Sequence, residues 1–137
     1  MNIVKLSSSV SVMAQIGPDD VAEIAARGYK VLVNNRPDGE EGDQPTDTQI
    51  AAAAIAAGIE YYHLPVTATD FPGPGFEQMS DLLDDPDNPV LAFCRTGTRC
   101  TNLWVASREA SELEQAEAIA QQLGYNLGMA EAYLDRR

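Results

Sequence analysis

The chain has 137 residues, 45% of them hydrophobic, which is enough for one compact core and too few for two ordinary domains, so we expect one domain over residues 1–137. Its formal net charge of −12 argues against nucleic acid and anionic membranes as partners, because a phosphate backbone attracts Lys and Arg. No apolar run reaches the roughly 18 residues of a membrane span, and the first ten residues lack the apolar body of a signal peptide. We therefore expect a cytoplasmic protein.

The first half of the chain predicts strands that alternate with helices. Short apolar runs indicate strands over 10–16, 29–34 and 59–66. Helices are expected over 18–27 and 47–57, because each is followed by a glycine that can end a helix. The intervening stretch NRPDGEEGDQP combines Pro, Gly and acidic residues without periodicity, so it is expected to be a loop.

The second half continues this alternation. The Pro- and Gly-rich segment 67–75 is expected to be irregular, and a short helix should follow over 75–85. The fully apolar run PVLAF, residues 89–93, is typical of a strand in the middle of a parallel sheet. Residues 101–124 predict one or two helices, and 126–137 a last short one. The whole pattern indicates an α/β fold with a mostly parallel sheet flanked by helices, in which ligands bind beyond the carboxyl ends of strands.

The segment CRTGTR, residues 94–99, stands at such an end. A loop between a buried strand and a helix collects unpaired backbone N–H groups and the positive end of the helix dipole, which together can hold an anion. Gly97 allows the loop to curl, and Thr96 and Thr98 add hydroxyl groups. Arg95 and Arg99 add positive charge in a chain that has only nine basic residues.

Cys94 lies at the floor of this predicted anion site. The same amides and arginines should stabilise its thiolate, which predicts a nucleophile at neutral pH. A free cysteine after an apolar run is often simply a buried core residue, but such a residue does not require Arg, Gly and Arg in the next five positions. The two cysteines and single histidine cannot form a four-ligand zinc site, and no motif implies an organic cofactor, so neither a metal nor a cofactor is expected.

Several stretches together resemble a known family. CRTGTR, NNRPDGEE, the segment TDTQIAAAAIAAGIEYYHLPV and the GPG loop are similar, in order and spacing, to the phosphatase-like domain of beta-lactamase-hydrolase-like proteins, over about residues 3–123. The resemblance implies the fold of dual-specificity protein phosphatases. It leaves the reaction open, because members of the family are labelled both as phosphatases and as sulfurtransferases.

Two departures from the phosphatase pattern favour sulfur transfer. Tyrosine and dual-specificity phosphatases typically have one residue more between Cys and Arg than the four that separate Cys94 from Arg99, and rhodaneses have the shorter loop. Phe93 replaces the histidine that phosphatases usually have before the cysteine. The first interpretation is therefore a rhodanese-like sulfurtransferase that carries sulfane sulfur from thiosulfate or a persulfide on Cys94. The family's fusion to metallo-hydrolase domains implies a persulfide-oxidising enzyme as a partner.

The alternative is a phosphatase that forms a phosphocysteine. In that reaction Arg99 would clamp the phosphoryl oxygens of a phosphate ester, and Asp70, on the Pro- and Gly-rich loop, is the candidate acid for the leaving oxygen, although Asp is also a common turn residue. Cys100 would either contact substrate and resolve an oxidised or persulfidated Cys94, or pack in the first helical turn. A third possibility is a regulatory module that binds anions without turnover.

Three other residues have expected roles outside the Cys94 loop. His63, between Tyr and Leu in a predicted strand, is expected to be a half-buried structural residue rather than a general base. Arg36 could contact substrate or pair with an acidic residue of its loop. Trp104 is expected to pack in the core.

Overall fold

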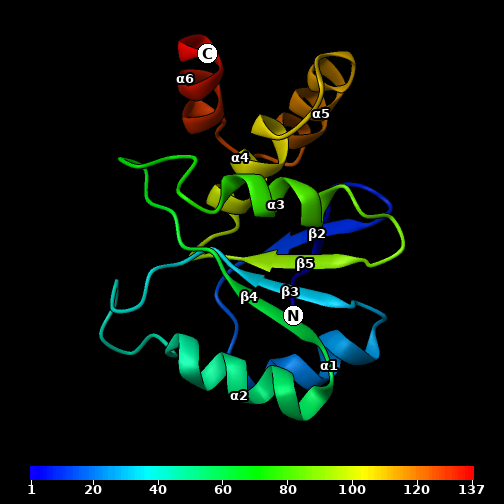
Figure 1. The fold of residues 1–137 in the computed structure, drawn as a ribbon, viewed down its shortest axis with the longest axis vertical. Coiled ribbons are helices and arrows are strands. Elements are labelled where there is room, and N and C mark those ends of the chain that lie inside the picture. The colour runs from blue at the N-terminus through cyan, green and yellow to red at the C-terminus, as the bar shows by residue number, and fades with distance from the viewer.

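A five-stranded sheet between two layers of helices forms the fold in the computed structural model, which describes residues 1–137 (Figure 1). The strands are β1 (Val4–Lys5), β2 (Val10–Met13), β3 (Val31–Asn34), β4 (Glu60–His63) and β5 (Val90–Phe93). Their order in the sheet is β1-β2-β5-β3-β4, and every neighbouring pair is parallel except β1 with β2. The mostly parallel α/β sheet expected from the sequence is confirmed. The short antiparallel strand β1 was not predicted.

Helices cover both faces of the sheet. One layer contains a 3-10 turn (Pro18–Asp20), α1 (Val21–Ala26) and α2 (Asp47–Ala57). The other contains α3 (Phe76–Leu83), α4 (Thr98–Ala106), α5 (Ala110–Gln122) and α6 (Gly128–Arg136). Figure 1 shows α1 and α2 below the sheet, α3 directly above it, and α4, α5 and α6 farther up. No helix combines the length and the apolar character that crossing a bilayer requires.

The two faces of β5 contribute to two separate hydrophobic cores. Val90 and Ala92 belong to the larger cluster beneath α3 and α4, while Leu91 and Phe93 belong to the cluster against α1 and α2. All four side chains are completely buried. Because β5 is buried on both faces and paired on both edges, the end of this strand is a firmly held position from which the Cys94 loop starts.

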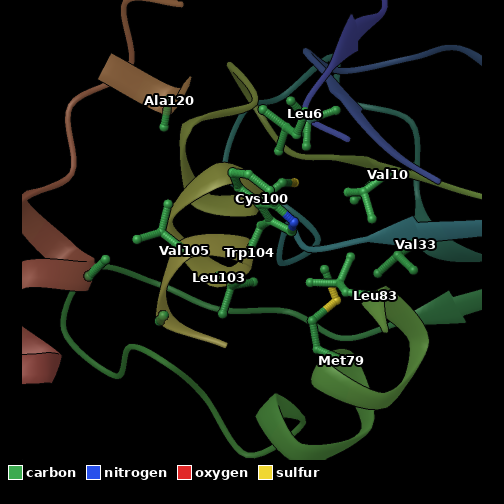
Figure 2. Packing of buried hydrophobic residues seen from close by; sticks show 14 of the residues in the cluster. Leu6, Val10, Val33, Met79, Leu83, Cys100, Leu103, Trp104, Val105 and Ala120 are labelled. Carbon is green, nitrogen blue, oxygen red and sulfur yellow. The ribbon is translucent and has the colours of Figure 1, made fainter. Parts of the chain in front are cut away.

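Helix α4 packs into the larger core along nearly its whole length. Figure 2 shows its side chains, including Leu103 and Trp104, close to Met79 and Leu83 of α3. Trp104 is buried, which confirms the packing role expected for it.

Helix α4 begins three residues earlier than predicted. The sequence placed the helical segment at 101–124, whereas α4 starts at Thr98 and a break at 107–109 separates it from α5. Gly97 occupies the N-cap with φ of +87°, a left-handed conformation that lets the chain turn sharply out of the strand. The early start brings Arg99 and Cys100 into the first helical turn.

Candidate active site

Cys94 follows directly after the central strand of the sheet. The segments that follow the two neighbouring strands hold this position. The N–H of Asn35 donates to the carbonyl of Phe93 at 2.9 Å, and the N–H of Gln15 donates to the carbonyl of Arg95 at 3.3 Å. The Cys94 sulfur in turn accepts a hydrogen bond from the Gly97 N–H at 3.1 Å. The loop therefore curls back over its own first residue, as the strand-to-helix pattern predicts.

The thiol of Cys94 is strongly acidic in this setting. Its pKa is lowered from 9.0 to about 5, chiefly by a hydrogen bond from the Cys100 thiol, with further contributions from the N–H groups of Cys100 and Thr96 and from the charge of Arg99. Burial acts in the opposite direction and is outweighed. Because the pKa lies well below neutrality, Cys94 is a thiolate at pH 7, the form that acts as a nucleophile.

Gly97 has little room for a side chain. A Cβ atom at this position would lie 3.3 Å from the hydroxyl of Tyr125 and 3.5 Å from the carbonyl oxygen of Met13. Together with the positive φ angle, this crowding explains why the loop needs glycine where the sequence has it.

Arg99 is held by a carboxylate from a distant part of the chain. Its Nη1 and Nη2 atoms each donate to Glu40 at 2.8 Å, and Nη1 also donates to the carbonyl of Val66 at 3.1 Å. An arginine has five N–H donors, so the Nε–H and one Nη2–H of Arg99 remain available for a bound anion. The bidentate pair lowers the pKa of Glu40 to about 2, chiefly through the hydrogen bond from Arg99, and raises the pKa of Arg99.

Glu40 is shared with a second arginine, Arg36. Arg36 is buried, with only 2% of its side chain exposed, and donates to Glu40 at 2.8 Å, to Glu41 at 2.6 Å and to Gln15 at 3.0 Å. Arg36 therefore pairs with acids of its own loop, which is one of the two roles that the sequence predicts for it. Sequence reasoning missed Glu40, whose only signal was its place in the NNRPDGEE stretch.

Two adjoining hollows open beside the Cys94 loop. One has a volume of about 410 Å³ and is lined by Glu40, Thr67, Ala68, Arg95, Thr96, Thr98, Arg99 and Met129. The other has a volume of about 530 Å³ and is lined entirely by charged residues, namely Arg36, Glu40, Glu41, Arg95 and Arg99. The structure thus brings together four of the residues predicted from the sequence, Arg95, Thr96, Thr98 and Arg99. Cys94 and Gly97, in the same loop, are buried and line neither hollow.

Asp70 is not among the residues that line these hollows. Its Oδ1 atom accepts hydrogen bonds from the N–H and the hydroxyl of Thr67, at 2.6 and 2.8 Å. These bonds, above all the one from the Thr67 N–H, lower the pKa of Asp70, which favours the ionised form over the proton donor that the phosphatase interpretation needs. The acid role of Asp70 stays a prediction, and its hydrogen bonds are those of a turn residue.

Cys100 also lies outside the hollows, because it is buried in the larger core cluster. Burial raises its pKa well above 9.0, so it is a neutral thiol. Its position in the first turn of α4 fits the packing role expected as the alternative to substrate contact, and its thiol also hydrogen-bonds to Cys94. Resolution of an oxidised Cys94 stays a prediction. No group of three or more His, Cys, Asp or Glu side chains is arranged to hold a metal ion.

His63 has the structural role that was expected. Its Nε2 atom is 2.8 Å from the carbonyl oxygen of Arg36, and its Nδ1 atom is 3.5 Å from Asp47. The histidine therefore supports the start of the loop that carries Glu40, and it does not line either hollow.

Comparison with known proteins identifies the family. The model of the family described as "Beta-lactamase hydrolase-like protein, phosphatase-like domain" matches residues 2–111. The chain belongs to this family. The resemblance noted in the sequence is thereby confirmed, although the match ends earlier than residue 123, soon after α5 begins.

Curated relatives of this phosphatase-like domain are longer proteins. Beta-lactamase hydrolase-like proteins of Xylella fastidiosa and Agrobacterium fabrum are 31% and 29% identical over 140 residues, an alignment that covers 100% of this chain and 32% of each relative. The chain therefore spans about a third of the length of these curated relatives.

Solved structures with the same fold include phosphatases. A candidate phosphatase of Neisseria meningitidis is 37% identical, with a TM-score of 0.81 and coverage of 99% of this chain and 98% of that one. Tk-PTP is 19% identical, with a TM-score of 0.68 and coverage of 98% and 94%. TpbA of P. aeruginosa is 18% identical, with a TM-score of 0.65 and coverage of 100% and 85%. The protein has the fold of the protein tyrosine and dual-specificity phosphatases, as expected.

Proposed function

We propose that this domain hydrolyses phosphate monoesters or anhydrides through a phosphocysteine on Cys94. The observation that carries the proposal is the joint geometry of the loop, in which a buried thiolate receives the Gly97 N–H and the neighbouring Arg99 keeps two N–H donors free. The phosphatase neighbours support this reaction over sulfur transfer, which was the first interpretation of the sequence. It is thus the alternative reaction that has the better support.

The reaction has two steps. In the first, the Cys94 sulfur attacks phosphorus, an S–P bond forms, and the P–O bond to the leaving group breaks. In the second, water attacks the phosphocysteine, and inorganic phosphate leaves as the thiolate is restored. The free N–H groups of Arg99 and the amides at the start of α4 stabilise the charge on the phosphoryl oxygens in both steps.

Rapid-quench mass spectrometry with p-nitrophenyl phosphate tests the proposal. The wild type should release phosphate and carry a phosphoryl group on Cys94, whereas Cys94→Ser should show neither. Arg99→Lys is the matched variant, because it keeps the positive charge and loses the planar pair of donors. A wild type that binds phosphate without any turnover would instead indicate the non-catalytic binding module.

Sulfur transfer is the second candidate, favoured by one observation. Only four residues separate Cys94 from Arg99, and a shorter loop suits a persulfide carried on the cysteine. The thiolate would attack the sulfane sulfur of thiosulfate, release sulfite, and pass the persulfide sulfur to a thiol or to cyanide. For this candidate we propose a persulfide-oxidising enzyme of metallo-hydrolase fold as the partner.

Intact-protein mass spectrometry after incubation with thiosulfate separates the two candidates. Sulfur transfer requires the mass of one sulfur atom on Cys94, removable by a reductant, which distinguishes a persulfide from irreversible sulfinic acid. Both candidates need a reduced thiolate, and we propose the cytoplasm as the compartment for either.

A further inference from the structure

We infer that the substrate is a phosphoanhydride, whose transferred phosphoryl group binds in the Cys94 loop beneath Arg99 and whose departing phosphate binds to Arg95. This inference rests on the proposed phosphatase reaction and names the class of substrate for the same site. Three features of the hollows beside the loop support it: the lack of an available acid, the loosely held guanidinium of Arg95, and the polar lining.

The first feature is that no side chain in the hollows is placed to protonate a leaving group. The carboxylates that line them are Glu40 and Glu41, and both are ion-paired to arginines. Glu40 stays ionised because Arg99 and Arg36 both donate to it. Apart from these acids, the polar side chains in the lining are arginines, which do not give up a proton, and threonine hydroxyls, which are far too weakly acidic.

The need for an acid depends on what leaves. An alkoxide from an ordinary alcohol is a poor leaving group without a proton, since its conjugate acid is about as weak as water, with a pKa of about 15.7. A phosphate needs no added proton at neutral pH, because the second pKa of a phosphate group is about 6. A site without an acid therefore favours cleavage of the bond between two phosphates.

The second feature is the loosely held guanidinium of Arg95. Its side chain is 63% exposed, and it lines both hollows. Its only ion pair joins Nε to the Glu41 Oε1 atom at 3.4 Å, and that oxygen already accepts a bond from Arg36 at 2.6 Å. The two Nη groups of Arg95 are thus free to hold a departing phosphate in bidentate fashion.

The third feature is the polar lining of the hollows. Only Ala68 and Met129 contribute apolar side chains to the hollow beside Thr96 and Thr98, and the adjoining one has none. No aromatic ring is available to stack on the ring of an aryl ester. A compact, highly charged leaving group fits this lining better than a phenol or a peptide.

The chemistry of the proposed cleavage is balanced without a further reactant except water. The Cys94 sulfur forms a bond to the terminal phosphorus as the bond from phosphorus to the bridging oxygen breaks. The electron pair of the broken bond stays on that oxygen, which is part of the departing phosphate. Arg95 binds this phosphate as it leaves. Water then hydrolyses the phosphocysteine.

The test compares kcat/KM for inorganic pyrophosphate, p-nitrophenyl phosphate and glycerol phosphate. The kcat/KM for pyrophosphate should exceed that for glycerol phosphate by about 100-fold or more, because only the alcohol that leaves glycerol phosphate needs a proton. Arg95→Gln should lower the ratio of kcat/KM for pyrophosphate to that for p-nitrophenyl phosphate by about tenfold, the effect of one lost charged hydrogen-bond pair. Arg27→Gln, which changes an exposed arginine directly after α1, is the matched control and should leave that ratio unchanged.

Three results would overturn the inference. The first is pyrophosphate left intact by an enzyme that hydrolyses p-nitrophenyl phosphate, which leaves the phosphatase proposal standing. The second is glycerol phosphate cleaved as fast as pyrophosphate and slowed selectively by Asp70→Asn, which would establish an acid. The third is the absence of both turnover and a phosphocysteine with all three compounds, which removes the phosphatase proposal as well.

Discussion

At the scale of single residues, the site is organised around one carboxylate, Glu40. It joins the buried Arg36 to Arg99, so that the arginine expected to bind the substrate is fixed by a partner 59 residues away in the sequence. The Glu40 pair occupies the Nη1 and Nη2 edge of Arg99 and leaves the Nε edge free. In this respect Glu40 is a positioning residue, which acts on the substrate only through Arg99.

Replacing Glu40 by Gln should lower kcat/KM for p-nitrophenyl phosphate by about 10² -fold, because a misdirected guanidinium loses its alignment with the phosphoryl oxygens. Glu41→Gln, which leaves the ion pair between Glu40 and Arg99 intact, should lower this kcat/KM much less. The loss should fall mainly on kcat, and Glu40→Asp should recover part of it. Equal losses in Glu40→Gln and Glu41→Gln would contradict the positioning role.

The low pKa of Cys94 predicts its reactivity with pH. Alkylation of Cys94 by iodoacetamide should be half-maximal near pH 5 and constant above about pH 7, whereas an ordinary thiol continues to gain reactivity up to pH 9. Because the pKa is lower in the folded state, the thiolate stabilises the fold above the unfolded pKa, and this contribution disappears as the pH falls toward 5. Peptide mapping of alkylated protein gives the profile, and a midpoint near pH 9 would contradict the prediction.

At the scale of elements, helix α4 connects the loop to the C-terminal helix. Asn102 is completely buried, and its side chain donates to the carbonyls of Thr98 and Asn126 at 2.9 and 2.8 Å and accepts from the N–H of Ala130 at 2.9 Å. The first turn of α4 is thereby joined to α6, which carries Met129 at the rim of the hollow.

Asn102→Ala should destabilise the protein by about 2 to 4 kcal/mol, because it leaves buried backbone groups of two segments without partners. Urea unfolding followed by circular dichroism measures the change. Gln121→Ala, at an exposed position of α5, is the control and should shift stability by less than about 0.5 kcal/mol. A change in Asn102→Ala no larger than in this control would refute the bridging role.

The elements differ in how far the sequence could predict them. The strand ending at Phe93 and the helix from Asp47 have local signals, an apolar run and a capped, glycine-terminated segment, and both are found where expected. Strand β1 is two residues long and exists because Val4 pairs with Val12, which no local pattern reveals. The ion pair between Glu40 and Arg99 was likewise hidden, because it depends on how the sheet brings two distant loops together.

At the scale of the whole molecule, the charge of −12 opposes the approach of an anionic substrate, even though Arg95 and Arg99 attract it at the site. Salt screens the distant charges more than the close contacts, since the Debye length falls from about 30 Å at 0.01 M to about 8 Å at 0.15 M. KM for p-nitrophenyl phosphate should therefore fall by about two- to threefold over this range. Alkylation by neutral iodoacetamide should not change, and a rise in KM would show that local attraction dominates.

The buried central position of β5 has a consequence for the way the site loses its activity. Hydrogen exchange should be slowest in the amides of β5, which are bonded on both sides, and much faster in the exposed stretch that carries Glu40. Mild heating or denaturant would then open the Glu40 loop long before the sheet. The protein should pass through a state in which Arg99 has been released and phosphate affinity is gone, while the sulfur of Cys94 is still sheltered by an intact core.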